Sequence, residues 1–191
     1  MALTRSLVVD AAVALLDEYG LESLSMRRLA TSLDVQPGAL YWHVKSKQDL
    51  LAAVASRIIS SVPLEASTRD EPLAAVRTIA LSFREALLAH RNGAEIVTLA
   101  QALADTPLPV RRAMHTALLE VLEPDPAAWT AQAVTHYVLG ATSEQQSRAD
   151  FTRAGVLPAG DEDEADLPAF VFGLDALIAG ASRTELTQLD G

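Results

Sequence analysis

The spacing of the apolar residues constrains this chain more than any other feature of its sequence. Near the N-terminus these residues recur three and four positions apart along one stripe, at Leu7, Val8, Ala11, Ala12, Leu15, Leu16 and Tyr19. This spacing follows the 3.6-residue turn of an α-helix. Thr4 and Gly20 stand where a helix cap is favoured at each end. Because alanine and leucine dominate and most glycines and prolines fall between such runs, the sequence predicts an all-α protein.

Further helices can be placed by the same pattern. One is expected after Ser25 and another from Pro37, where the missing N–H costs nothing, to about His43. A third begins after Ser46, whose spacing to Asp49 is that of a capping box. Beyond a connection at 63–72, helices are expected at about 72–90, 94–104, 108–122, 127–148 and 167–186, with an acidic Gly/Pro loop at 155–166. We therefore expect a three-helix domain at 1–45, a connecting helix at 46–62 and a larger helical domain at 63–191.

The charge of the chain is divided unevenly along its length. The net charge is −10, yet residues 1–60 hold six basic and six acidic side chains and are neutral overall. Residues 61–191 hold nine basic and nineteen acidic side chains and carry the whole excess. Phosphate binding depends on the field within a Debye length of about 10 Å, not on the global charge. From Arg27 to Lys47 there are four cations against one anion, Asp34, so this segment is the candidate DNA surface.

Some classes of protein are disfavoured by composition. The chain has no cysteine, which excludes disulfides and thiolate chemistry and is consistent with a reducing cytoplasm. The N-terminal segment resembles neither a signal peptide nor a membrane span. The most apolar run, 167–181, is too short to cross a bilayer and contains Asp175. We expect a cytoplasmic protein with no membrane partner.

Residues 25–44 have the spacing of a helix-turn-helix, with apolar positions at Leu29, Leu33, Val35 and Leu40. Asp34 occupies the turn position usually given to glycine, and aspartate tolerates a left-handed backbone better than most residues. Other helical hairpins share this pattern, so spacing alone leaves DNA binding and a structural hairpin as alternatives.

The side chains that follow Leu40 favour DNA binding. If Leu40 and Val44 pack inward, a rotation of about 100° per residue turns at least two of the three residues between them, 41–43, away from the core. Polar-tipped rings and lysines suit phosphate oxygens, which receive most protein–DNA hydrogen bonds. For Trp42 alone, the alternative is a half-buried position between helices.

The chain resembles the tetracycline-repressor (TetR) family over nearly its whole length. The segments that carry the resemblance are 4–51, which includes "LYWHVKSK" at 40–47, and "LLAHRNGAEIV" at 87–97, "THYVLGATSEQQ" at 135–146 and "FVFGLDALIAG" at 170–180. The resemblance implies an N-terminal helix-turn-helix DNA-binding domain and a helical domain for ligand binding and dimerisation.

The resemblance also implies roles for individual residues. Arg27 matches an arginine that reads a base, and a bidentate contact to guanine is the commonest specific contact. The positions expected at the DNA are Ser25, Arg27, Gln36, Gly38, Ala39, Tyr41, Trp42, His43, Lys45 and Lys47. Pro37, Gly38 and Ala39 replace polar base-reading side chains of the family, so the docking geometry is expected to be retained with a different operator sequence.

A ligand site is expected in the second domain. His136, Gly140 and Glu144 fall at i, i+4 and i+8 on one helix face, so they could converge on a ligand or could be a core histidine and a solvated glutamate. The resemblance favours a ligand site and implies Phe83, Val97, Gln101, Val110, Met114, His136 and Glu144 as its residues. Val97 replaces a histidine that binds magnesium in the family, so we expect no metal and an effector other than magnesium-tetracycline.

The most favoured function is a homodimeric repressor released from a palindromic DNA operator by a small-molecule effector. Surplus apolar surface at 127–148 and 167–186 is expected to form a four-helix bundle across a two-fold axis. One alternative is a helical ligand-binding dimer without sequence-specific DNA binding. The other, an enzyme using His136 and Glu144, is disfavoured because the sequence shows no second acid–base pair, thiol nucleophile or phosphate-binding loop. We expect no catalytic residue and no cofactor.

Overall fold

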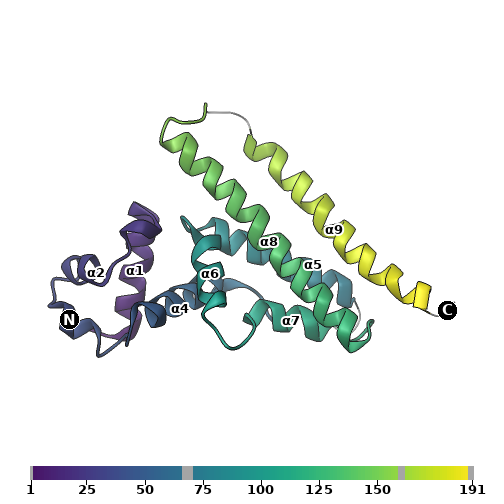
Figure 1. The fold of residues 1–191 in the computed structure, drawn as a ribbon, viewed down its shortest axis with the longest axis horizontal. Helices are drawn as coiled ribbons and strands as arrows, with labels where there is room; N and C mark the ends of the chain where they lie inside the picture. The colour runs from purple at the N-terminus through teal and green to yellow at the C-terminus, as the bar shows by residue number, and fades with distance from the viewer. Residues whose placement is uncertain (1, 66–70, 159–161, 189–191) are drawn as a thin grey trace. The chain divides into compact units, whose positions relative to one another are not determined.

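The computed structural model describes residues 2–65, 71–158 and 162–188, and within these ranges the regular elements are all helical. In chain order they are α1 (Arg5–Tyr19), η1 (Leu21–Ser23), α2 (Met26–Ser32), α3 (Pro37–Leu40), α4 (Lys47–Ile58), η2 (Ile59–Ser61), α5 (Pro72–Leu88), α6 (Gly93–Ala102), α7 (Pro109–Leu118), α8 (Pro124–Arg153) and α9 (Glu162–Gln188) (Figure 1). The all-α prediction is confirmed.

The predicted caps at Thr4, Gly20 and Ser46 are confirmed by their hydrogen bonds, whereas α3 ends at Leu40 rather than at about His43. The hydroxyl of Thr4 accepts a hydrogen bond from the N–H of Leu7, and Gly20 ends α1 with a positive φ of 77°. The hydroxyl of Ser46 accepts from the N–H of Asp49 at the start of α4. Each cap satisfies a backbone group that the helix itself leaves without a partner.

The chain forms two compact units. The first contains Met1–Ser61 and Ala86–Thr106, and the second contains Val62–Glu85 and Pro107–Gly191. In the first unit α1 packs against α2 and α4, α2 packs against α3, and α6 lies along α4. Packing therefore groups residues 86–106 with the N-terminal helices, whereas the predicted domain ranges divide the chain by sequence position alone.

In the second unit, α7 packs against α8, and α8 and α9 run side by side (Figure 1). The buried side of α8 is formed by small and β-branched residues, among them Ala131, Val134, Val138 and Thr142. Phe170, Leu174 and Ile178 are buried on α9 at four-residue spacing. The core of this unit therefore follows the apolar period of the sequence.

Two predicted segments differ from the structure. The loop predicted at 155–166 is shorter, because α9 begins at Glu162; residues 159–161 lie outside the described part of the chain. Similarly, α8 extends past the predicted 127–148 to Pro124 and Arg153. Both differences arise at polar helix ends, where no apolar period marks the boundary. The predicted connection at 63–72 includes residues 66–70, which also lie outside the described part.

Candidate functional site

The helix-turn-helix is held together by a small apolar core. Leu29 on α2 and Leu40 on α3 are fully buried, as is Val44 just beyond α3. Burial of a side chain of this size stabilises a fold by roughly 1.5–3 kcal/mol. Asp34 adopts the left-handed conformation expected of the turn, with φ 53°. The N–H of the next residue, Val35, then donates to the carbonyl of Ala30. The inward positions predicted for Leu29, Leu40 and Val44 are confirmed, whereas Leu33 and Val35 are only half-buried.

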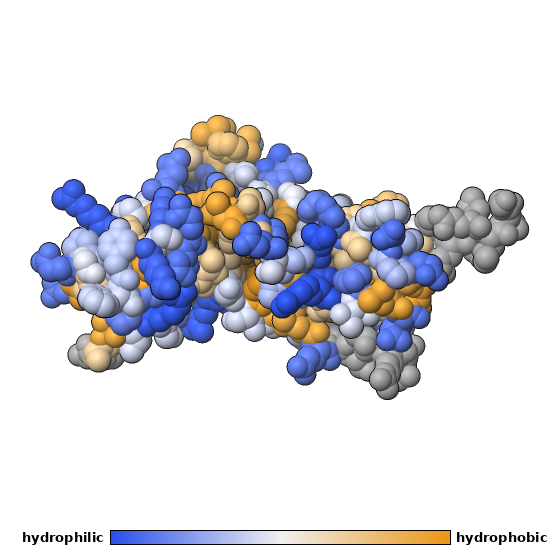
Figure 2. Space-filling view, turned by 60° about the horizontal axis from the view of Figure 1, so that its bottom comes forward, coloured by the Kyte–Doolittle hydropathy of each residue, from blue (hydrophilic) through white to orange (hydrophobic). Residues whose placement is uncertain are grey.

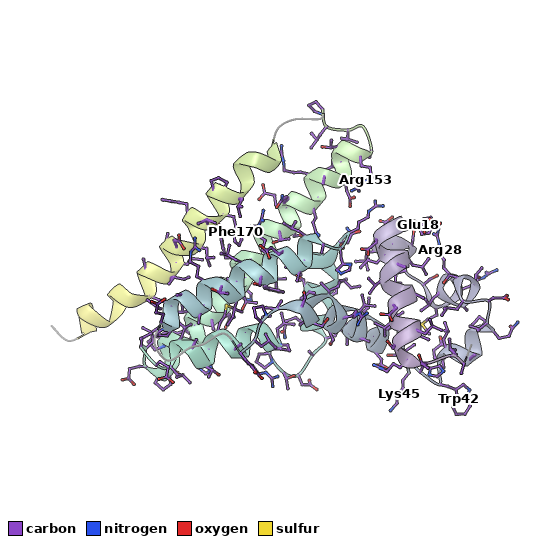
Figure 3. All side chains as sticks on the ribbon, turned by 180° about the vertical axis from the view of Figure 1, so that it is seen from behind. Glu18, Arg28, Trp42, Lys45, Arg153 and Phe170 are labelled. Atoms are coloured by element: carbon purple, nitrogen blue, oxygen red, sulfur yellow. The ribbon has the colours of Figure 1, made fainter. Side chains whose placement is uncertain are left out.

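Tyr41 and Trp42 point away from that core. Their exposed fractions are 51% for Tyr41 and 89% for Trp42, so Trp42 is not a half-buried side chain between helices. In Figure 3 Trp42 and Lys45 both extend from the ribbon on the same side of this unit. Folding buries little of this indole, and large exposed apolar groups mark interaction surfaces when they gather with other binding groups.

The cations around these rings lack acidic partners. Within the described ranges, Arg27, Lys45 and Lys47 form no side-chain ion pair. Arg28 lies over the ring of Tyr19, with 4.0 Å between its Cζ atom and the ring centroid. Since Arg27 and the two lysines are exposed and form no direct ion pair with a described residue, their charge is available to phosphate oxygens.

A charged clamp fixes the segment that carries the lysines. Arg5 Nη2 donates to Asp49 Oδ1 at 2.7 Å, and Arg5 Nη1 donates to the carbonyl of His43. Asp49 Oδ2 also accepts from the backbone N–H of Lys45 at 2.9 Å. The hydrogen bond from Arg5, followed by that from the Lys45 N–H, lowers the pKa of Asp49 from 3.8 to about 2. The clamp therefore holds residues 43–45 against the start of α1.

The other predicted DNA residues also belong to this unit. The hydroxyl of Ser25 caps α2 by accepting from the N–H of Arg28, and it retains a hydrogen to donate. Gln36 is the N-cap residue of α3 but makes no side-chain capping bond. No atom lies within 4 Å of where a Cβ on Gly38 would stand. Ala39 and His43 are half-buried. All ten predicted residues thus belong to the helix-turn-helix and the start of α4, and their contact with DNA remains a prediction.

The predicted ligand residues are distributed over both units. Val97 and Gln101 lie on α6 in the first unit, with Val97 fully buried. Phe83, Val110 and Met114 are fully buried in the second unit. His136 and Glu144 are exposed on α8, so His136 is not a core histidine. Their role in ligand binding remains a prediction.

The comparisons with known proteins agree with this geometry. The family model described as "Bacterial regulatory proteins, tetR family" matches residues 8–54, from α1 into α4. The chain is 34% identical to the tetracycline repressor protein class G of Vibrio anguillarum, over 98% of this chain and 97% of that protein. The chain belongs to the TetR family.

Solved structures of TetR-family proteins share the fold. BioQ with its natural double-stranded DNA operator is 33% identical, with a TM-score of 0.77, over 95% of this chain and 99% of that one. A TetR variant from Acinetobacter baumannii AYE in complex with minocycline is 35% identical, with a TM-score of 0.80, over 96% of this chain and 98% of that one. The class G relative is a repressor by name, and BioQ was solved with its DNA operator. No helix in the described ranges combines the length and apolar character needed to cross a membrane.

Three features of this TetR-family protein were not predicted from its sequence. The first is the clamp between Arg5 and Asp49. The second is a tie at the end of α1, where Asp17 accepts from His90 Nδ1 at 3.0 Å and from the N–H of Arg91 at 3.1 Å. The third is the nearly buried side chain of Arg84 on α5. The first two pairs are more than 40 residues apart in sequence, so no local pattern indicates them.

Proposed function

We propose that this TetR-family protein is an effector-responsive DNA-binding repressor that acts as a homodimer in the cytoplasm. The observation that carries this proposal is the surface of the helix-turn-helix. Leu40 and Val44 anchor it, while Trp42, Lys45 and Lys47 are exposed and neither lysine forms a direct ion pair in the described part of the chain. The TetR-family structure of BioQ with a DNA operator supports the same use of this surface. The proposed role is regulatory rather than enzymatic.

Different residues of the proposed interface are suited to the DNA backbone and to the bases. The lysines and the aromatic tips are suited to the DNA backbone, which positions the protein without reading sequence. Arg27, at the start of α2, is suited to a bidentate contact with guanine. Gly38 and Ala39 at the front of α3 carry no hydrogen-bonding side chain, and Ala39 can contact only an apolar group such as a thymine methyl. We therefore propose the docking geometry of the family with an operator of different sequence.

Fluorescence anisotropy with labelled DNA that flanks the protein's own gene tests this proposal. We expect sequence-dependent binding that weakens steeply with salt, because each phosphate contact releases counterions. Arg27→Ala is expected to cost about 1–3 kcal/mol and to relax preference at one base position. Arg57→Ala is the matched control, because Arg57 pairs with Asp10 at 3.0 Å on α1. Equal weakening on all sequences would make Arg27 a phosphate contact instead.

Failure to bind any DNA at low salt would favour a different function. The chain would then be a helical ligand-binding dimer without sequence-specific DNA binding. The apolar front of α3, at Gly38 and Ala39, is the feature that favours this alternative. Light scattering would still report the mass of two chains in that case, so the two functions differ in the DNA measurement alone.

In the second unit, the effector is proposed to contact the fully buried Phe83, Val110 and Met114, with His136 and Glu144 as polar contributors. Val97 and Gln101, in the first unit, remain predicted effector residues. With valine at position 97, the protein offers no imidazole there to a metal ion, and an apolar effector without metal is favoured. Isothermal titration with magnesium-tetracycline is expected to give no binding. Binding in the micromolar range would overturn this assignment.

The homodimer is proposed to form through α8 and α9. Trp129 on α8 and Phe172 on α9 are large apolar residues with exposed fractions of 65% and 78%. Figure 2 shows hydrophobic residues gathered in several places on the surface, between hydrophilic ones. A symmetric dimer would place two helix-turn-helix units on the two half-sites of a palindrome, about one turn of DNA or a multiple apart.

A further inference from the structure

The second unit contains a cavity between α5, α8 and α9 whose binding chemistry was not predicted from the sequence. Its volume is about 300 Å³, at the lower end of the range for small-molecule sites. Arg84 from α5, Glu144 from α8 and Phe170 from α9 all line it. In Figure 3 Phe170 lies on the side of α9 that faces α5. Of the predicted effector residues, only Glu144 contributes to the wall.

Arg84 is the unusual member of this wall. Its exposed fraction is 8%, and its Nη2 atom donates to Gln145 Oε1 at 2.6 Å. Its Cζ atom lies 4.9 Å from the centroid of the Phe170 ring. Both partners are neutral, and in the described part of the chain no carboxylate pairs with Arg84. A buried cation without a counter-ion is costly, so this position favours any anion that can reach it.

The aromatic pair beside Arg84 is fixed in place. Tyr137 stacks on Phe170 with 5.1 Å between ring centroids, and its hydroxyl donates to the Phe170 carbonyl at 3.0 Å. A Cβ on Gly173 would stand 2.2 Å from the Tyr137 hydroxyl, so glycine allows this close approach of α8 and α9. The guanidinium face is therefore held against a rigid ring, while four of its five N–H donors have no partner in the described residues.

The size and charge of the wall restrict the ligand. A volume of 300 Å³ corresponds to roughly ten water molecules at about 30 Å³ each, far more than one inorganic ion requires. Ala141, Ala169 and Phe170 supply apolar surface for an organic body. Glu144 and Arg148 add one charge of each sign, so the wall carries a net charge of +1 with Arg84.

From these observations we infer that the cavity binds a small organic monocarboxylate, whose carboxylate pairs with Arg84 and whose body lies against Phe170. The guanidinium fork can bind a carboxylate through two parallel hydrogen bonds, which a lysine cannot reproduce. Glu144 at the wall disfavours ligands with two negative charges. This site goes beyond the proposed repressor function, because it does not depend on DNA binding.

Calorimetric titration of the full chain with sodium benzoate tests this inference. Benzamide is the matched neutral ligand, and sodium sulfate represents an inorganic anion. We expect benzoate to bind at least tenfold more tightly than benzamide, and sulfate not to compete with it. Equal binding of benzoate and benzamide would overturn the ion pair, and binding of sulfate alone would overturn the organic ligand.

Substitutions in the cavity wall test whether benzoate binds at Arg84. Arg84→Met is expected to weaken benzoate binding at least tenfold, whereas Glu144→Gln is expected to strengthen it severalfold by removing a negative charge. Arg77→Met is the control, because Arg77 lies on the same helix but pairs with Asp175 at 2.7 Å. Unchanged binding by Arg84→Met would refute the site.

The inference can still be tested if Arg84→Met does not fold, and it can be separated from the proposed repressor function. If Arg84→Met fails to fold, Arg84→Lys retains the charge without the fork and is expected to lose most of the affinity; the benzoate–benzamide contrast needs no variant at all. DNA anisotropy on the same samples separates the two proposals, because loss of operator binding would leave the benzoate titration unchanged.

Discussion

Replacing Asp49 by asparagine should destabilise the protein by removing the charge at the centre of the clamp. The variant Asp49→Asn keeps the size of the side chain and one acceptor oxygen, but it loses the ion pair with Arg5. The clamp lowers the pKa of Asp49 from 3.8 to about 2, and one pKa unit corresponds to about 1.4 kcal/mol. Full coupling would therefore contribute about 2 kcal/mol. Because the side chain of Arg5 is 51% exposed, solvent screens the pair, and we expect about 1 kcal/mol.

The pH dependence of this loss has a definite sign. The folded-state pKa of Asp49 lies below its unfolded-state pKa. The clamp therefore stabilises the fold fully above the unfolded-state pKa, and this stabilisation is lost as the pH falls from there through the folded-state pKa. Urea denaturation at a series of pH values should show wild type more stable than Asp49→Asn by about 1 kcal/mol at neutral pH. The difference should shrink between pH 3.8 and about 2. At neutral pH it corresponds to a Tm difference of about 2–4 °C for a chain of this length.

The matched control is Asp10→Asn. Asp10 pairs with Arg57 at 3.0 Å, but the two side chains are 45% and 55% exposed. Such surface pairs contribute about 0–1 kcal/mol, usually near the lower limit. A difference between wild type and Asp49→Asn that persisted unchanged below the folded-state pKa would refute the electrostatic account. So would an equal loss in Asp10→Asn.

Three other substitutions probe the packing and the interface. Gly93→Ala should destabilise by about 1–3 kcal/mol in thermal denaturation, because its Cβ would stand 2.3 Å from the carbonyl oxygen of Leu87; a neutral effect would show that the backbone yields easily. A Cβ at position 38 would meet open space, so Gly38→Ala should stabilise α3 by up to about 1 kcal/mol. The same variant should weaken operator binding measured by anisotropy. Unchanged DNA affinity would exclude a close approach of DNA to residue 38. Trp42→Ala should leave the Tm unchanged, since the indole is 89% exposed, while reducing DNA affinity; a lowered Tm would instead give the ring a folding role.

Features that depend on residues close together in the sequence could be predicted from the sequence alone. The caps at Thr4 and Ser46 are interactions between residues three apart, so their spacing can be read directly from the sequence. The exposure of Trp42 follows from helical rotation once Leu40 is known to face inward. The helical fold and the surface of the helix-turn-helix were therefore accessible before the structure.

Features that depend on tertiary neighbours were not accessible in this way. Helical phase identifies a face of a helix but not what covers it. His136 and Glu144 lie on α8 at the spacing of one face, and both side chains are exposed, while Arg84 on α5 is nearly buried against residues of α8 and α9. The hydrogen bond between Asp17 and His90 joins residues 73 apart in sequence, so it depends on the tertiary packing of the first unit.

That tie gives the proposed effector response a physical route within the first unit. Asp17 holds the turn before α6 to the end of α1, and α6 packs along α4. Val97 and Gln101, both predicted to contact the effector, lie on α6. An effector that binds one arrangement of α6 more tightly shifts the population of that arrangement, by no more than its difference in affinity. Because α6 and α4 are packed together, we propose that such a shift reaches α4, whose first residue, Lys47, belongs to the proposed DNA interface.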